Sequence, residues 1–267
     1  MAELVFLKLG GSLITDKTGE SVARPRVIRR LASEVRTALN KRPGLKLVLG
    51  HGSGSFGHVV ASRYGTQKGV RGPEAWQGFA EVADTAAQLN RIVTSAFVKA
   101  GVPVLSLAPS ALARCEKGTL AKFDITLIAT ALKAGLVPLV YGDVVFDAAL
   151  GGTIASTEDI LAYLTCELTP TRILLAGDVP GVFGSSSSGR VVPVITPAMF
   201  EKIRPALSGS RSTDVTGGMA GKVTQMLALV ERYPRLTVHI LSGKTPGLIQ
   251  RALTSPDVST GTRLLAR

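Results

Sequence analysis

Short apolar runs alternate along the chain with longer stretches in which apolar residues recur every three or four positions. Four of the runs predict buried strands, over residues 4–9, 45–49, 102–107 and 236–241. Two further segments, 136–147 and 172–183, predict strands that continue into loops, the first loop carrying two aspartates. The periodic stretches predict helices over residues 27–39, 79–97, 123–135, 156–164, 217–233 and 245–253.

Two of these helices carry signals at their ends. Asp124 is placed to cap the start of the helix in 123–135, and Gly135 is placed to end it. Ser156 stands three residues before Asp159, which is a variant of the capping box. The local signals and the periodicity therefore predict the same elements.

The alternation predicts an α/β fold. Strands that are apolar throughout are typical of parallel sheets, whose two faces are covered by helices. The chain has 267 residues, enough for one large domain or two small ones, and no internal repeat or clear linker divides it. We therefore expect a parallel sheet with helices on both faces.

The composition is that of a folded protein in a reducing compartment. Hydrophobic residues make up 45% of the chain and charged residues 19%, which favours a substantial core over disorder. Cys115 and Cys166 stand far apart, so we expect two small core residues and no disulfide or zinc framework. No apolar run is long enough for a membrane span, and the N-terminus lacks signal-peptide features, so we expect a cytoplasmic protein.

The net charge of +12 favours anionic partners. Basic residues are dispersed along the chain, aromatic residues make up only 5%, and no strand mixes the two as RNA-binding strands do. Phosphorylated small molecules fit this charge better than nucleic acid or a membrane surface. A basic nucleic-acid-binding α/β protein is the alternative outside the enzymes.

Small and charged residues collect where the predicted strands end. Ligands of open α/β sheets bind beyond the carboxyl ends of the strands, and glycine-rich backbone there presents N–H groups to phosphate oxygens. Lys8 interrupts a buried strand, where an ammonium group requires an anion. The other residues at strand ends are Gly10, Gly11 and Ser12, the segment 50–57, Gly142 and Asp143, Gly177 and Asp178, and Gly243 and Lys244.

Two nucleotide-binding patterns are only partly matched. GSGSFG, residues 52–57, has the glycine spacing of dinucleotide-binding folds, which also need an acidic residue about twenty positions on, at a strand end. Glu74 has that spacing but lies in a turn that leads into a helix, so the pattern fails. GGMAGK, residues 217–222, is one residue short of a Walker A loop and is followed by Val223 instead of Ser or Thr.

Six segments nevertheless occur together and in order: KLGGSLITDK (8–17), HGSGSFGH (51–58), GDVVFD (142–147), STED (156–159), GDVPGVF (177–183) and DVTGGMAGK (214–222). With them the chain resembles, over nearly its whole length, the amino acid kinase superfamily and within it the isopentenyl phosphate kinases. The resemblance implies an open αβα sandwich with a mainly parallel central sheet. It implies one domain, with the acceptor bound by roughly residues 1–165 and the nucleotide by roughly 166–267.

The resemblance also implies the reaction and its participants. A family member of this kind uses ATP and Mg²⁺ to phosphorylate isopentenyl phosphate to isopentenyl diphosphate, and is usually a homodimer. Another small phosphate or phosphonate, such as fosfomycin, is the first alternative acceptor within the superfamily. A carboxylate or carbamate is the second.

Site residues follow from the matched motifs. By the resemblance, Lys8 and Lys17 would neutralise the phosphates during transfer, and Asp159 would orient the lysines. His58 would hold the acceptor's phosphate, and no side chain is assigned as a direct metal ligand. ATP would contact Lys8, Gly10, Gly11, Ser12, Gly54, Asp178, Gly217 and Lys222, and the acceptor would contact Gly52, Ser53, Gly57, His58 and Thr157.

The chain departs from the family pattern at three points. GDVPGV stands where T-D-V-D-G-V is frequent, so Pro180 removes a backbone N–H and a carboxylate near the nucleotide. Ser53 stands where glycine or alanine is frequent. Thr157 and Glu158 vary an S-G-D-D pattern in which Asp159 is kept.

A histidine at the end of the glycine loop fits an acceptor that is itself a phosphate. Phosphoryl transfer depends on positioning and charge neutralisation, and a monoester with a second pKa of about 6 needs no base to remove a proton. It needs a donor or cation against the repulsion of ATP, which His58 can supply. For His51 the sequence allows two roles, packing and local hydrogen bonding. His239 is expected in the core.

The acceptor's apolar tail requires an apolar wall. Candidates on the predicted long helix and near the aspartate-containing loop are Phe79, Val82, Ala83, Val145 and Ile154. The same residues could equally be core.

Overall fold

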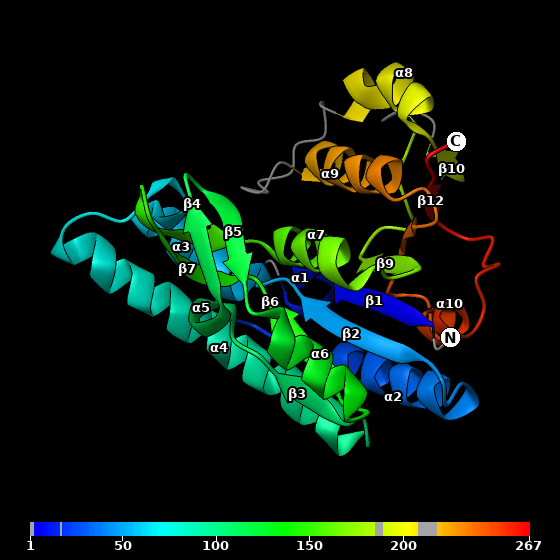
Figure 1. Cartoon of the computed structure of the whole chain (residues 1–267), viewed down its shortest axis with the longest axis horizontal. Coiled ribbons are helices and arrows are strands. Elements are labelled where there is room, and N and C mark those ends of the chain that lie inside the picture. The colour runs from blue at the N-terminus through cyan, green and yellow to red at the C-terminus, as the bar shows by residue number, and fades with distance from the viewer. Residues whose placement is uncertain (1–2, 17, 185–188, 208–217) are drawn as a thin grey trace.

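The computed structural model describes residues 3–16, 18–184, 189–207 and 218–267. Its central sheet consists of β1 (Leu4–Leu9), β2 (Lys46–His51), β3 (Val104–Ser106), β6 (Val137–Tyr141), β9 (Arg172–Gly177), β10 (Val194–Ile195), β11 (Thr237–Ser242) and β12 (Thr262–Leu264). The strand order is β10-β12-β11-β9-β1-β2-β6-β3 (Figure 1). All neighbouring pairs are parallel except β11 and β12.

Helices cover both faces of this sheet. One face is covered by α2 (Pro25–Lys41), α4 (Pro73–Lys99) and α10 (Leu248–Thr254), and the other by α6 (Ile125–Lys133), α7 (Thr157–Leu168), α8 (Pro197–Leu207) and α9 (Gly218–Arg232). In Figure 1, α2 and α4 lie below the central strands, and α7 and α9 lie above them. The predicted α/β sandwich with a mainly parallel sheet is confirmed.

Side-chain alternation in β1 assigns residues to the two faces. Val5, Leu7 and Leu9 are fully buried in the cluster that includes α2, α4 and α10. Phe6 lies in the opposite cluster, with α6, α7 and α9. Because successive side chains of a strand point to opposite faces, Lys8 lies on the same face as Phe6, toward α7.

The sequence pattern missed the strands of a second sheet, as well as β10 and β12 of the central one. The order of the second sheet is β5-β4-β7-β8, from strands β4 (Ala113–Glu116), β5 (Thr119–Phe123), β7 (Asp143–Asp147) and β8 (Gly151–Ala155). The predicted loop with two aspartates is therefore wrong, because Asp143 and Asp147 begin and end β7. These strands are short, and β4 alternates buried with exposed residues, so they lack the continuous apolar run of the central strands.

Short helices follow the first two strands. α1 (Gly11–Ile14) comes directly after β1, and α3 (Gly54–Tyr64) comes after β2. A 3₁₀ turn, η1 (Thr66–Lys68), follows α3, and α5 (Pro109–Leu112) precedes β4. The glycine loops at the ends of β1 and β2 therefore lead straight into helix N-termini.

The helix-end signals are confirmed in part. The Asp124 side chain accepts a hydrogen bond from Thr126 N, and Ser156 and Asp159 form the expected capping box at the start of α7. The last helix is shorter than predicted. It begins at Leu248 after Gly247, which has a positive φ of 74°, so Pro246 precedes the helix.

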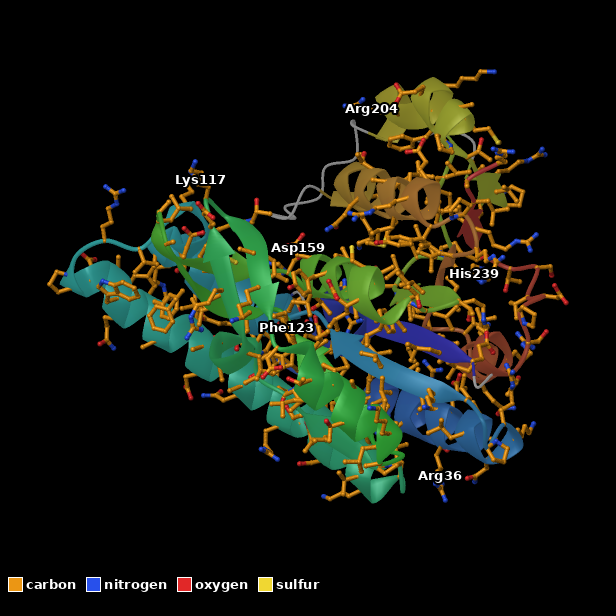
Figure 2. The ribbon with its side chains drawn as sticks, viewed as in Figure 1. Arg36, Lys117, Phe123, Asp159, Arg204 and His239 are labelled. Atoms are coloured by element: carbon orange, nitrogen blue, oxygen red, sulfur yellow. The ribbon has the colours of Figure 1, made fainter. Side chains whose placement is uncertain are left out.

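Burial agrees with most of the expectations for single residues. His239 in β11 is buried, with Nε2 2.7 Å from the carbonyl oxygen of Thr260 (Figure 2). Cys115 is buried, whereas Cys166 is only partly buried, and both thiols are free. Within the residues that the structure describes, no helix combines the length and apolarity of a membrane span.

Asp147 joins two turns of the second sheet. Its carboxylate accepts hydrogen bonds from the backbone N–H groups of Lys117, Gly118, Ala149 and Leu150, at distances of 2.7 to 3.2 Å. Burial acts to raise the pKa of Asp147, but these four donors outweigh it, so the pKa lies below its usual value.

We expect Asp147→Ala to lower the free energy of unfolding by about 1 to 3 kcal/mol at pH 7, because four backbone donors lose a charged acceptor. Since the folded-state pKa is depressed, the stabilisation by the carboxylate is complete above about pH 4 and is lost as the pH falls below it. Urea unfolding of wild type and Asp147→Asn at pH 7 and pH 3 should show a smaller difference at pH 3. Asp257→Ala, at an exposed aspartate, serves as the control. An equal difference at both pH values would contradict the assignment.

Candidate active site

A cleft of about 1200 Å³ opens at the carboxyl ends of the central strands. Segments far apart in sequence line it, among them the ends of β1, β2 and β9, the starts of α3 and α7, and parts of α4 and α9. Most of the residues predicted from the sequence lie here together, namely Lys8, Gly10, Gly11, Ser12, Gly52, Ser53, Gly54, Gly57, His58, Thr157, Asp178 and Lys222.

Three predicted residues are not among those lining the cleft. Lys17 and Gly217 lie outside the described residues. Asp159 is described, but it is not part of the lining.

Two glycine loops meet with their backbones in contact. A Cβ atom on Gly11 would lie only 2.3 Å from the backbone nitrogen of Gly54, and one on Gly54 would lie 2.1 Å from Thr15 Oγ1. Gly54 also has a positive φ of 53°, which residues with a side chain rarely adopt. Thr15 binds the loops together, since its hydroxyl donates to Gly11 O and accepts from Ser55 N. The contact brings both loops to the same side of the cleft.

The N-terminal end of α3 faces the cleft, and its N-cap residue Ser53 makes no side-chain cap, although Thr15 binds the N–H of Ser55. The unpaired N–H groups at such an end, together with the helix dipole, favour an anion. Gly54, Gly57, His58 and Ala61 are spaced by three or four residues and all line the cleft, so they share one face of α3. His58 is thereby placed one turn along the helix from the backbone donors.

Glu158 holds the two described lysines of the site. Lys8 Nζ donates to Glu158 Oε1 at 2.5 Å, and Lys222 Nζ lies 3.5 Å from the same oxygen. The Lys8 and Glu158 side chains are 8% and 14% exposed. Burial alone would raise the pKa of Glu158, but the two ammonium groups outweigh it and hold the pKa at about 2. Glu158 is therefore ionised at neutral pH.

The structure places the Asp159 side chain in a helix cap. Its Oδ2 accepts hydrogen bonds from the backbone and hydroxyl of Ser156, at 3.1 and 2.6 Å, and its Oδ1 accepts from Gln225 Nε2 at 2.7 Å. Asp159 thus caps α7 and joins it to α9 (Figure 2). The carboxylate placed against the lysines is that of Glu158, one residue earlier.

Two polar side chains of the predicted site are engaged within the protein. Ser12 Oγ donates to Asp178 Oδ1 at 3.1 Å, which links the loops after β1 and β9. Thr157 is fully buried, and its hydroxyl donates to the carbonyl oxygen of His51 at 2.6 Å. Thr157 therefore supports the loop after β2 from behind.

The apolar part of the cleft agrees partly with the prediction. Val82 and Ile154 line it, and Ala86 joins them one turn along α4. Phe79, Ala83 and Val145 are not part of the lining. Pro180 is exposed and also outside the lining, so the cleft wall after β9 is made by Asp178 and Val179 instead.

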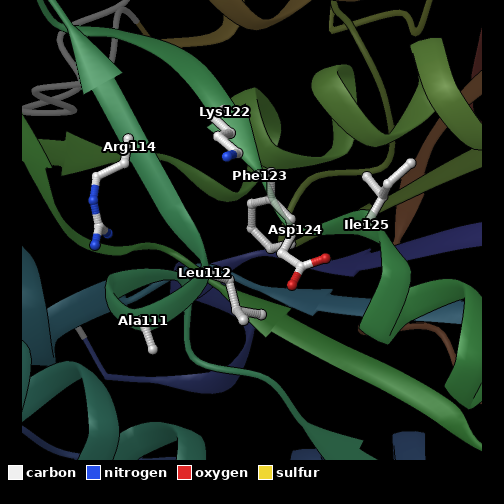
Figure 3. Close-up of a pocket in the computed structure, with 7 residues that line it drawn as sticks. All are labelled: Ala111, Leu112, Arg114, Lys122, Phe123, Asp124 and Ile125. Atoms are coloured by element: carbon white, nitrogen blue, oxygen red, sulfur yellow. The ribbon is translucent and has the colours of Figure 1, made fainter.

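A smaller hollow of about 480 Å³ lies at the second sheet, away from the predicted residues (Figure 3). Its polar side chains are Arg114, Lys122 and Asp124, and the last of these already caps α6. None of the residues predicted from the motifs lines it.

Sequence reasoning missed the role of Glu158. Two signals could have identified it. The Ser156–Asp159 capping box leaves Asp159 unavailable for the lysines, and Glu158 is the next acidic side chain. Glu158 also stands at an acidic position of the S-G-D-D pattern, so its identity as a carboxylate was visible.

The cleft, the paired lysines and the glycine loops agree with the results of comparison with known proteins. The chain belongs to the amino acid kinase family, whose model matches residues 3–242. It is 35% identical to an isopentenyl phosphate kinase of Methanothermobacter thermautotrophicus, over 99% of this chain and 100% of that protein. It is 36% identical to that of Methanocaldococcus jannaschii, over 94% of this chain and 95% of that protein. An X-ray structure of an isopentenyl phosphate kinase superposes with a TM-score of 0.82 at 32% identity, covering 98% and 100% of the two chains.

We expect Glu158→Gln to lower kcat by about 100-fold, because Lys8 loses the anion that holds its ammonium group in place. Asp159→Asn removes a capping carboxylate and should cost about 1 kcal/mol of stability, with a much smaller fall in kcat. Steady-state kinetics and thermal unfolding of both variants separate the two roles. A kcat that falls equally in both variants would return the lysine-orienting role to Asp159.

Proposed function

We propose that the chain is an ATP-dependent kinase that phosphorylates isopentenyl phosphate to isopentenyl diphosphate. The observation that carries the proposal is the arrangement of Lys8, Glu158 and Lys222 in the same cleft as a glycine loop that ends in His58. The cations suit the negative charge on a phosphoryl group in transfer, and the histidine suits an acceptor that is already a phosphate. The named relatives support the same reaction.

Charge neutralisation falls to the lysines. Lys8 and Lys222 carry two positive charges and Glu158 one negative charge, so the three groups together leave a net charge of +1 for the phosphates. Glu158 holds both ammonium groups at one carboxylate oxygen, which reduces their reorganisation during transfer. We propose that Lys17, in the segment that follows α1, adds a further positive charge.

The acceptor phosphate is proposed to bind at the start of α3. The N–H groups at Gly54 and the preceding loop would donate to its oxygens, and His58 would hold it from the next turn. No general base is required, because the attacking oxygen of a phosphate monoester is already ionised at neutral pH. The isoprenoid tail would lie against Val82, Ala86 and Ile154.

The nucleotide is proposed to bind next to the acceptor, in the part of the cleft nearer to β9 and α9. Gly10, Gly11, Ser12, Asp178 and Lys222 line that part, and Gly217 would extend it. A Cβ on Gly52 would lie 3.0 Å from Gly11 N, so glycine at this position lets the two loops pack together beside the proposed phosphates. The described residues contain no cluster of three or more metal-ligating side chains, so Mg²⁺ would be held mainly by phosphate oxygens and water, where it neutralises developing charge.

The proposal includes three further expectations, on the division of the domain, the cellular compartment and the oligomeric state. The acceptor would be bound mainly by roughly residues 1–165 and the nucleotide by the remainder of one domain, in a cytoplasmic enzyme. The subunit would pair with a second copy. Exposed Ile92 and Val98 on α4 and Leu105 on the edge strand β3 support pairing on that side, because an open strand edge favours association.

The reaction is tested by measuring ADP release with MgATP and a panel of acceptors: isopentenyl phosphate, dimethylallyl phosphate, fosfomycin, UMP, acetylglutamate and carbamate. We expect the highest kcat/KM with isopentenyl phosphate, because only a prenyl phosphate combines a monoester with a short apolar tail. Preferential turnover of fosfomycin or a carboxylate would contradict the proposal. A salt-sensitive gel shift with no turnover would favour the nucleic-acid alternative.

We expect His58→Ala to raise the KM for the acceptor by about 10- to 100-fold, the loss of one charge-assisted hydrogen bond. The KM for ATP should change by less than about threefold, since the same bond is not made to the nucleotide. Initial rates with each substrate varied in turn separate the two constants. Equal increases in both constants would place His58 outside the acceptor's part of the cleft.

A further inference from the structure

A hydrogen-bonded network of buried polar side chains lies directly behind the loop that follows β2. His51, the last residue of β2, is 1% exposed, and Asn90 on α4 is 4% exposed. His51 Nδ1 lies 3.1 Å from the carbonyl oxygen of Gly52, and its Nε2 lies 3.2 Å from Asn90 Nδ2. Beyond Asn90, its Oδ1 accepts from Ser106 Oγ at 2.6 Å and from Thr94 Oγ1 at 3.4 Å.

The partners determine the protonation state of the ring. A carbonyl oxygen can only accept, so Nδ1 of His51 must carry a proton. Asn90 presents its amide nitrogen, a donor, so Nε2 must be unprotonated and accept. The ring is therefore neutral and in the Nδ1–H form. Each group in this network then has one consistent donor or acceptor role.

The surroundings of the ring agree with a neutral histidine. Burial lowers the pKa of His51 to about 4, and the nearby ammonium group of Lys8 acts in the same direction, outweighing the hydrogen bond to Gly52. The ring stacks on Tyr141 with centroids 5.5 Å apart and planes 5° apart. Thr157 holds the His51 carbonyl, so both the backbone and the ring are restrained.

When the Gly52 carbonyl is held in one orientation, the N–H of Ser53 in the same peptide is held in the opposite orientation. The carbonyl of Gly52 and the N–H of Ser53 belong to one planar trans peptide, in which the two groups point in opposite directions. The carbonyl is turned toward the buried ring, and both Gly52 and Ser53 line the cleft. The N–H of Ser53 is accordingly directed away from the core, beside the start of α3.

We propose that His51 is a positioning residue for phosphoryl transfer: by donating from Nδ1 to the Gly52 carbonyl, it holds the Gly52–Ser53 peptide with the Ser53 N–H directed at the phosphate. The proposal rests on the proposed kinase function and deepens it, because His51 does not touch substrate. It assigns different work to the two loop histidines. His58 contacts the acceptor, and His51 orients the backbone N–H that binds the phosphate.

Two substitutions separate the roles of the two ring nitrogens of His51. An asparagine amide nitrogen can take the place of Nδ1, so His51→Asn keeps a donor for Gly52. A glutamine amide nitrogen takes the place of Nε2, so His51→Gln keeps a group near Asn90 but loses the donor. We expect His51→Asn to retain kcat within about threefold of wild type, and His51→Gln to lose at least about tenfold, with KM values and melting temperatures similar in both variants.

A merely structural role for the ring would give a different result. Both variants would then lose stability and kcat together, without a difference between them. Equal kcat losses in His51→Asn and His51→Gln would overturn the proposal.

Two spectroscopic readouts on the wild-type protein do not depend on the variants or on the acceptor. The chain has three histidines, so ¹⁵N–¹H long-range spectra can be assigned with His58→Ala and His51→Asn. We expect His51 in the neutral Nδ1–H form from pH 6 to 8. An Nε2–H ring or a charged one in this range would overturn the proposal.

The backbone amide of Ser53 gives the second readout. Titration with inorganic phosphate should shift its proton resonance downfield, as expected for a donor to a phosphate oxygen. An unchanged Ser53 resonance at saturating phosphate would overturn the proposal. Because inorganic phosphate is the probe, these outcomes remain distinct from failure of the kinase assay, in which wild type would turn over no prenyl phosphate.

Discussion

An ammonium group within a buried strand is the constraint on which the rest of the site depends. Lys8 lies in β1, near the middle of the eight-stranded sheet, and the alternation of β1 directs it at the face covered by α7. Removing such a charge from water is costly unless an anion accompanies it. Glu158 supplies the anion at 2.5 Å, so the position of α7 and the charge in β1 determine each other.

The same carboxylate draws a third element into the site. Lys222 of α9 lies 3.5 Å from the Glu158 oxygen that Lys8 binds, and Gln225, one turn later, binds Asp159. Two adjacent carboxylates at the start of α7 thus hold α9 at two points, one toward the cleft and one outside it. The two neighbouring acidic residues therefore have different contacts: Glu158 faces the two lysines, and Asp159 completes a helix cap.

The sequence predicted the large sheet, its helices and the site better than it predicted the second sheet. Continuous apolar runs such as residues 4–9 have one physical explanation, burial on both faces, so their strands were found with bounds close to those observed. β4 and β7 are short and contain polar residues, and their pairing depends on contacts remote in sequence, which periodicity does not contain.

At the site, motif spacing located the residues but not their contacts. The cleft glycines follow strand ends and Lys8 interrupts an apolar strand, and the sequence shows both directly. Whether Glu158 or Asp159 faces the lysines depends on the direction of each side chain at the first turn of α7, a difference of about 100° between adjacent residues of a helix. Likewise, the choice between packing and hydrogen bonding for His51 needed the position of Asn90, which is distant in sequence and comes from another helix.

The backbone contact between Gly11 and Gly54 has a consequence for how the enzyme can diversify. Neither position has room for even a methyl group, so both glycines are closed to substitution. Val82, Ala86 and Ile154 lie at the apolar end of the cleft, on α4 and β8, where side chains of different size can be exchanged without separating the two loops. A library intended to change the acceptor should therefore leave both glycine loops intact and place all its variation at the apolar end.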